Sequence, residues 1–173
     1  LGAMVTDSAT GRPLILSNNH VLANSSRIGF DRARVYDAIL QPGPLHGGTL
    51  DDTVGALLRY VPLNLEYAWS DPPVPAPGRS ANLVDAAVAT IMGVGYDPDI
   101  VGLGRVSGIV VATPGMTVRK SGQSTGVTEG LVTSTQAAMR IDYDRGFFGR
   151  FEDQIVCDLE VAGGDSGALV VDE

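Results

Sequence analysis

Short hydrophobic runs recur along the chain, some alternating with polar residues and some continuous, and turn-forming residues separate them. In the first half these runs predict β-strands at residues 2–6, 12–16, 34–40, 54–61 and 85–91. No long stretch repeats its hydrophobic residues every 3.6 positions. Residues 50–59 and 84–92 compete as helices, but both segments contain β-branched residues. The pattern therefore predicts an all-β protein.

The second half of the chain continues in the same style. Strands are predicted at residues 105–112, 117–120, 126–134, 139–143, 155–161 and 167–171. Residues 62–79 hold five prolines and predict an irregular excursion on the surface. Residues 93–104 contain four glycines without a clear period, so we expect them to link two units, residues 1–95 and residues 96–173.

Composition narrows the functional classes. The 22 glycines and 10 prolines fit the many turns of an all-β fold. The net charge of −8 argues against nucleic-acid binding, and no hydrophobic run reaches the ~18 residues of a membrane helix. The only cysteine, Cys157, excludes a disulfide within the chain and fits either a bacterial cytoplasmic or a secreted protein. One cysteine and two histidines are too few for a structural zinc site, and we expect no metal or cofactor.

Ser166 lies in the sequence Gly164-Asp165-Ser166-Gly167, directly before a hydrophobic run. A serine hydroxyl is a weak nucleophile and needs a base beside it. Glycines at 163, 164 and 167 allow a sharp turn whose N–H groups approach a ligand closely. The N–H groups of Gly164 and Ser166 are therefore candidates for binding the oxyanion of a tetrahedral intermediate. The alternative interpretation of this segment is a simple turn.

His20 follows a hydrophobic strand that ends in Ser17-Asn18-Asn19, and a helical turn is predicted after it. This position suits a general base at the rim of a β-barrel, although a lone histidine also fits a core or capping position. His46 lies in a loop rich in proline and glycine and is interpreted as solvated.

A histidine base needs an acid that fixes its tautomer. Asp85 stands among small and hydrophobic residues at the start of a predicted strand, where burial is costly unless the carboxylate is paired. Asp51 and Asp52 are rivals, but their loop is rich in glycine and threonine and is expected to face solvent. We therefore expect Asp85 to be the partner of His20.

The chain order of His20, Asp85 and Ser166, together with the Gly-Asp-Ser-Gly motif, resembles the trypsin/chymotrypsin-like serine proteases. The Asn-Asn-His-Val-Leu segment is similar to the HtrA branch, and residues 117–132 resemble a hairpin of bacterial members. The resemblance covers most of both halves outside the proline-rich segment. It implies an all-β, double β-barrel chymotrypsin-like fold, with His20 and Asp85 on the first barrel and Ser166 on the second.

The resemblance also implies a serine endopeptidase that acts on protein or peptide substrates through an acyl-enzyme, without a cofactor. His20 would act as general base and then general acid, Asp85 would orient it, and Ser166 would attack the scissile carbonyl. Glu160 occupies the offset that marks the floor of the specificity pocket in trypsin-like members, where an acid selects Arg or Lys. Its alternation with hydrophobic neighbours also fits an exposed strand face. Asp165 pairs with a new N-terminus in activated zymogens of this clan, but we infer no such role because no activation motif is present.

The chain ends seven residues after Ser166, whereas members of the clan usually continue with two more strands. We therefore expect an incomplete C-terminal barrel with an open edge, and a C-terminal fragment or extension as a partner. Self-cleavage near residue 173 is one hypothesis for this end. The main alternative function is a protease-fold module that binds or regulates without turnover. An α/β-hydrolase esterase is disfavoured because its serine precedes its histidine.

Overall fold

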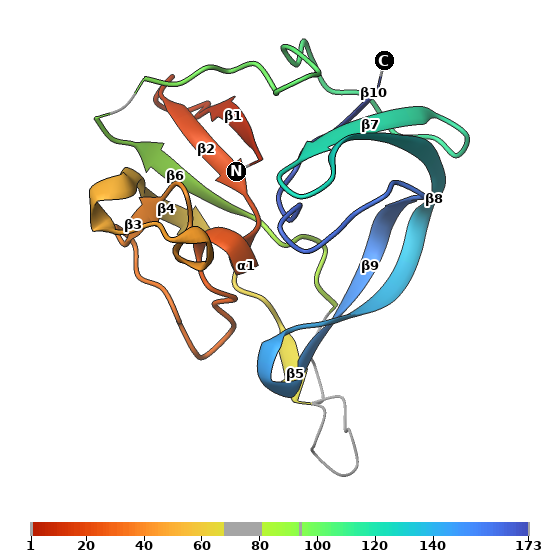
Figure 1. Ribbon diagram of the computed structural model, residues 1–173. Helices are drawn as coiled ribbons and strands as arrows, with labels where there is room; N and C mark the ends of the chain where they lie inside the picture. Colours follow the sequence, from red (N-terminus) through yellow and green to blue (C-terminus); the bar gives the residue numbers. More distant parts are fainter. Residues whose placement is uncertain (1, 68–80, 94, 173) are drawn as a thin grey trace.

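The computed structural model describes residues 2–67, 81–93 and 95–172. It consists mainly of two curled antiparallel β-sheets that lie side by side, and one of them forms a half-barrel (Figure 1). The short helix α1 (Asn19–Leu22) lies near the junction of the two sheets. The predicted all-β class is therefore confirmed.

The first sheet is formed by the first half of the chain, with the strand order β1, β2, β6, β4, β3. The strands span Ala3–Thr6 (β1), Pro13–Ser17 (β2), Ala87–Ile91 (β6), Thr53–Tyr60 (β4) and Ala38–Leu40 (β3). β2 and β6 are antiparallel neighbours, and Ser17 lies opposite Ala87. Because His20 follows β2 and Asp85 precedes β6, this register brings both residues to the same end of the sheet.

The second sheet has the strand order β10, β7, β8, β9, β5. The strands span Val170–Asp172 (β10), Thr117–Gly122 (β7), Gly126–Asp142 (β8), Phe147–Cys157 (β9) and Leu65–Tyr67 (β5). β8 pairs with both β7 and β9, and register shifts between Val132 and Met139 mark its bend. Ser166 lies on the loop between β9 and β10, so this sheet carries the predicted nucleophile. Short 3-10 helices complete the structure at Pro44–His46 (η1), Leu50–Asp52 (η2) and Asp144–Gly146 (η3).

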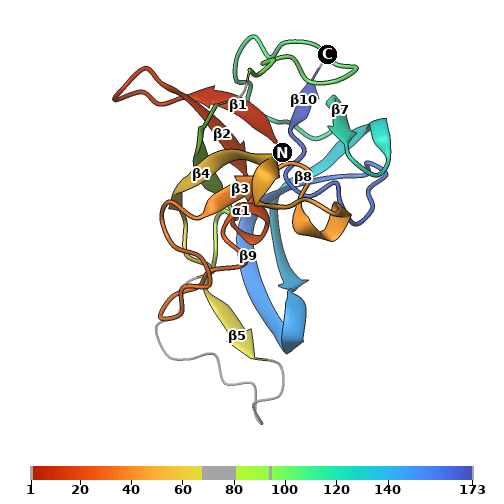
Figure 2. The ribbon, with the colours of Figure 1, turned by 60° about the vertical axis from the view of Figure 1, so that its left-hand side comes forward.

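Two segments from the first half of the chain contact the second sheet. β5 pairs with β9, and Figures 1 and 2 show it at the end of the molecule opposite β1. The Asn82 side chain bonds to the backbone of Asn64 and Arg150, and the Asn82 backbone N–H donates to Arg150 O at 2.8 Å. The first half of the chain thus contributes to both sheets, and the division at residue 95 remains a prediction.

Each sheet has its own hydrophobic core. In the first, the fully buried Leu57 packs with Ile15, Ile39 and, from α1, Leu22. In the second, three buried residues pack with three partly buried ones: Leu63, Leu65, Phe151, Met139, Tyr143 and Phe147. Because α1 and Tyr143 belong to these clusters, the two cores fix the elements that border the candidate site.

Several predicted elements are wrong or shortened. Residues 105–112 form no strand in the structure, and Ile109 and Val111 are exposed because no strand among the described residues pairs with this segment. The strand predicted at 34–40 is reduced to β3, since Tyr36 has a φ of 77° that interrupts an extended backbone.

The second half shows two further differences. The strands predicted at 126–134 and 139–143 are parts of one strand, β8. β9 begins at Phe147, earlier than predicted, and ends at Cys157, so residues 158–161 are not in a strand. Most of the proline-rich segment predicted as an excursion, residues 68–79, lies outside the described residues.

Candidate active site

His20 is the second residue of α1, and β2 ends three residues before it. The two asparagines that precede it are anchored to backbone carbonyls. Asn18 Nδ2 donates at 2.8 Å to a carbonyl just before β6. The fully buried Asn19 donates to Ser26 O at 2.9 Å and to Val61 O at 2.6 Å. This anchored turn holds the imidazole at the rim of the first sheet, where its side chain is 33% exposed.

Asp85 contacts His20 through both carboxylate oxygens. Asp85 Oδ2 lies 2.6 Å from His20 Nδ1, and Oδ1 accepts the His20 backbone N–H at 3.2 Å. Burial tends to raise the pKa of Asp85, but the hydrogen bonds and the charge of His20 hold that pKa below its ordinary value. An ionised Asp85 accepts the bond from Nδ1–H, which leaves Nε2 of the neutral imidazole as a proton acceptor.

Tyr143 is a member of this cluster that the sequence did not single out. It follows β8 of the second sheet, and its hydroxyl donates to Asp85 Oδ2 at 3.0 Å. Burial, followed by the negative charge of Asp85 and the hydrogen bond to it, raises the pKa of Tyr143. Its ring lies edge-on to the His20 ring, with centroids 6.1 Å apart. No local motif signals this contact, because Tyr143 and Asp85 are 58 positions apart in the sequence.

Ser166 is exposed on the loop between β9 and β10. Gly164 and Gly167, which flank it, have φ values of 105° and 88°, a region that favours glycine. Gly167 packs against the end of β2, where a Cβ at this position would overlap the Ser17 hydroxyl. The glycine thus allows the loop to approach the strand that leads to His20.

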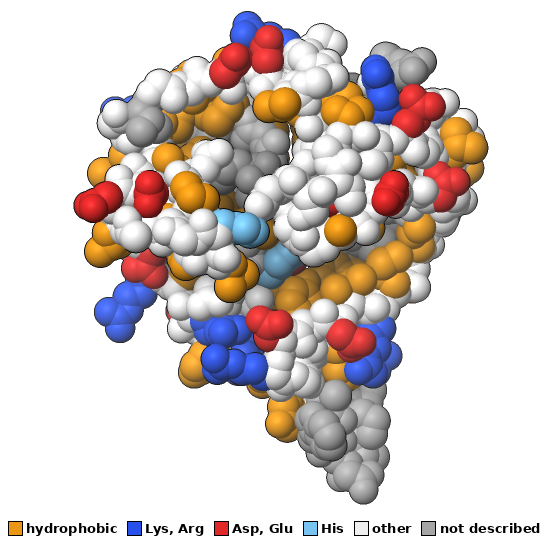
Figure 3. Space-filling view, in the orientation of Figure 1, with side chains coloured by type: hydrophobic (Ala, Val, Ile, Leu, Met, Phe, Trp, Pro, Cys, Tyr) orange, Lys and Arg blue, Asp and Glu red, His pale blue; other side chains and the backbone are white. Residues whose placement is uncertain are grey.

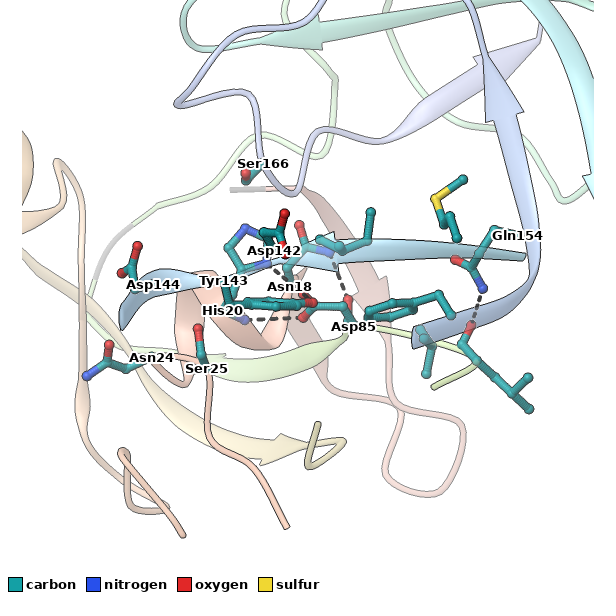
Figure 4. Close-up of a pocket in the computed structure, with 15 residues that line it drawn as sticks. Asn18, His20, Asn24, Ser25, Asp85, Asp142, Tyr143, Asp144, Gln154 and Ser166 are labelled. Carbon is teal, nitrogen blue, oxygen red and sulfur yellow. Dashed lines mark hydrogen bonds and ion pairs between the residues drawn. The ribbon is translucent and has the colours of Figure 1, made fainter. Parts of the chain in front are cut away.

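His20, Asp85 and Ser166 line the same cleft. Figure 4 shows Asp85 and Ser166 on opposite sides of the His20 imidazole. Within the described part of the chain, no hydrogen bond joins Ser166 to His20. The structure therefore brings the three predicted residues together, with the His20–Asp85 pair already formed.

The N–H groups of Gly164 and Ser166 have no acceptor among the described residues, and the same holds for their neighbours Gly163 and Gly167. Two neighbouring N–H groups form hydrogen bonds within the loop. The Asp165 N–H donates to Ala162 O at 3.1 Å, and the Ala168 N–H donates to Asp165 O at 3.0 Å. The N–H groups of Gly164 and Ser166 are therefore available to a ligand, and their role in binding an oxyanion remains a prediction.

Asp165 is buried and forms an ion pair with the buried Lys120 of β7 at 3.1 Å. It also accepts hydrogen bonds from Ser124 N–H and from the Thr125 N–H and hydroxyl. The Thr125 hydroxyl, aided by Ser124 and Lys120, holds the pKa of Asp165 well below its ordinary value, although burial opposes this. An internal lysine thus provides the cation beside Asp165, a pairing that the sequence analysis missed.

Acid is expected to destabilise the protein through Asp165. Its pKa in the folded state lies below the unfolded value of about 3.9. The ionised carboxylate therefore stabilises the folded state at pH values above the unfolded-state pKa. This contribution is lost as the pH falls through the folded-state pKa. Asp165→Asn should melt at a lower temperature than wild type at neutral pH. Its melting temperature should also fall less than that of wild type between about pH 5 and about pH 2. Thermal unfolding followed by circular dichroism measures this, and parallel curves for the two proteins would contradict it.

The cleft has a volume of about 640 Å³, and it is bordered by α1 and segments flanking the first sheet and by residues of the second sheet. Figure 3 shows the histidine side chains at the boundary between the two halves, with a row of hydrophobic side chains leading away from them. The hydrophobic and acidic residues of the lining are Leu83, Val84, Met139, Ile141, Phe151, Asp85, Asp142 and Asp144. None of the described residues that line the cleft is a lysine or an arginine.

The other candidates from the sequence are not among the described residues that line the cleft. Glu160 is exposed and is not among the described residues that line the cleft, so its role in specificity remains a prediction. His46 and Asp51 are exposed in η1 and η2, and Asp52 bonds to Thr49. The described residues contain no group of three His, Cys, Asp or Glu side chains that could hold a metal ion. No helix among them has the length and hydrophobicity required to span a membrane.

Comparisons with known proteins support the fold. No protein-family model matches the sequence, and no curated protein matches it significantly. The chain is similar to the crystal structure of Nocardiopsis protease (NAPase), with a TM-score of 0.60, 18% identity, and coverage of 99% of this chain and 71% of that chain. It is also similar to the crystal structure of Cellulomonas bogoriensis chymotrypsin, with a TM-score of 0.50, 17% identity, and coverage of 99% and 75%. The chain therefore has a trypsin/chymotrypsin-like fold.

Proposed function

We propose that this protein is a serine endopeptidase in which Ser166 is the nucleophile, His20 is the general base, and Asp85 orients His20. The observation that carries this proposal is the 2.6 Å contact between His20 Nδ1 and Asp85 Oδ2 at a cleft that Ser166 also lines. A carboxylate bound to Nδ1 fixes the tautomer in which Nε2 accepts a proton, which is the state that a serine nucleophile requires.

The proposed reaction proceeds in two halves. Ser166 Oγ bonds to the carbonyl carbon while its proton moves to His20 Nε2, and the N–H groups of Gly164 and Ser166 stabilise the oxyanion. His20 then donates this proton to the leaving amine, the C–N bond breaks, and an ester remains on Ser166. A water molecule then attacks the ester carbonyl carbon while it transfers a proton to His20 Nε2. The ester C–O bond breaks, His20 returns that proton to Ser166 Oγ, and the acid is released.

The absence of a hydrogen bond between Ser166 and His20 is compatible with this role. Catalytic hydrogen bonds are often long or poorly aligned without substrate and tighten when it binds. The open cleft suits a peptide chain, and the hydrophobic residues Met139, Ile141 and Phe151 provide a surface for apolar side chains. Protein or peptide is therefore the substrate class that we propose.

Wild-type protein is expected to cleave members of a mixed peptide library, and His20→Ala is expected to leave the same peptides intact. Mass spectrometry of the products identifies each new terminus and reports the preferred side chains. His46→Ala is the matched control, because His46 is exposed on η1 and outside the cleft. Peptide binding without cleavage by folded wild type would contradict the proposal and favour a protease-fold binding or regulatory module.

A further inference from the structure

Tyr143 connects the two sheets at the candidate site. His20 and Asp85 flank strands of the first sheet, whereas Tyr143 lies between β8 and η3 of the second. Its hydroxyl donates to Asp85 Oδ2 at 3.0 Å, which is the same oxygen that His20 Nδ1 contacts at 2.6 Å. The second sheet also carries the Ser166 loop. One hydrogen bond thus ties the His20–Asp85 pair to the sheet on which the nucleophile stands.

The phenol is itself held in a fixed position. The Tyr143 N–H donates to Phe147 O at 2.7 Å, which closes the turn between β8 and β9. Its ring lies between His20, at a centroid distance of 6.1 Å, and Phe151, which stacks at 6.5 Å. Because both the backbone and the ring are constrained, the hydroxyl has little freedom to leave the carboxylate.

Each oxygen of the Asp85 carboxylate accepts at least one hydrogen bond. Oδ1 accepts the His20 backbone N–H, and Oδ2 accepts both His20 Nδ1–H and the Tyr143 hydroxyl. Without Tyr143, every one of these donors would come from His20, and the carboxylate could move together with the imidazole. A donor from the other sheet removes that freedom.

We propose that Tyr143 is a positioning residue that fixes the Asp85 carboxylate, and through it the His20 imidazole, relative to Ser166. This inference rests on the proposed function for its catalytic consequence, but the positioning itself is independent of turnover. Burial and the adjacent negative charge raise the pKa of Tyr143, so the phenol keeps the proton that it donates over the working range of pH.

The test is Tyr143→Phe, which removes only the hydroxyl and keeps the ring between His20 and Phe151. Tyr60→Phe is the matched control, because the Tyr60 hydroxyl donates to a different carboxylate, Asp31, at 2.7 Å. Histidine Nδ1 protons bound to a carboxylate resonate far downfield in proton NMR spectra. The chain has two histidines, so His20→Ala assigns the signal. The rate of Ser166 labelling by a fluorophosphonate is measured on the same samples.

The far-downfield proton of His20 should be present in wild type and Tyr60→Phe, and should be broadened or lost in Tyr143→Phe through faster exchange with water. Labelling of Tyr143→Phe should be about tenfold slower, as expected for a lost hydrogen bond to a charged group. An unchanged resonance in Tyr143→Phe, or no such resonance in wild type, would overturn the positioning role. Loss of the resonance in Tyr143→Phe without labelling of wild type would support that role and would overturn the proposed function instead.

Discussion

Replacing Ser166 by alanine is expected to lower the rate of peptide hydrolysis about 10⁶-fold. The Ser166 hydroxyl supplies the oxygen of the acyl-enzyme, so without it His20 and Asp85 have no nucleophile to activate. The substitution should leave the fold unchanged, because Ser166 is exposed and its side chain makes no hydrogen bond within the described residues. The loss should therefore be chemical rather than structural.

Initial rates on a peptide that wild type cleaves measure this effect. Ser107→Ala is the matched control, since Ser107 is an exposed serine on the segment before β7 and should be replaceable without loss of rate. Circular dichroism of each variant verifies that the fold is kept. A Ser166→Ala rate within about tenfold of wild type would mean that another residue is the nucleophile.

Asp85→Asn is expected to lower the same rate about 10⁴-fold. The amide has nearly the shape of the carboxylate, so it can keep the contacts to His20 and Tyr143. An amide N–H facing Nδ1, however, favours the tautomer in which the imidazole proton is on Nε2, and that nitrogen can no longer accept the serine proton. The loss of the negative charge also removes the stabilisation of the imidazolium that forms during attack.

Asp51→Asn is the control for Asp85→Asn, because Asp51 is the rival acid from the sequence and is exposed on η2. It should cleave peptides at the wild-type rate. Proton NMR of His20 in Asp85→Asn should also lack the far-downfield Nδ1 signal. If Asp51→Asn lost activity and Asp85→Asn kept it, the assignment of the acid would be reversed.

The three proposed catalytic residues could be selected from the sequence because each stands in a distinctive local setting. Ser166 is flanked by glycines whose φ values of 105° and 88° explain why glycine is needed there. His20 follows two asparagines, and the structure adds that both anchor the turn through backbone carbonyls. Asp85 stood out as a carboxylate among small and hydrophobic residues, a setting that requires a partner.

The contacts that complete the site could not be predicted in the same way. Tyr143 reaches Asp85, and Lys120 reaches Asp165, only because the chain brings distant segments together. The local sequence does not mark either residue as part of the site: Tyr143 is predicted as the end of a strand, and Lys120 as a polar position in a hairpin. A buried lysine beside a buried aspartate depends on tertiary packing, which local patterns do not encode.

The errors in the fold have a similar origin. Residues 105–112 have the hydrophobic character of a strand, but a strand also needs a neighbour for its backbone hydrogen bonds. None of the described strands pairs with this segment. The sequence predicts two strands in place of β8, because register shifts interrupt the alternation of hydrophobic and polar residues where β8 bends between β7 and β9. Strand identity follows from composition, whereas pairing and length depend on the partner strand.

The most direct test of the account is labelling with a fluorophosphonate, read by intact mass and by mapping of the modified peptide. The probe reacts with a serine only where a base activates the hydroxyl and donors stabilise the adduct. We predict one adduct per wild-type molecule, located on Ser166, with the same result for His46→Ala and no adduct for Ser166→Ala or His20→Ala. Folded wild type that remains unlabelled, or labelling that persists in Ser166→Ala, would contradict the assignment of a serine hydrolase site to His20, Asp85 and Ser166.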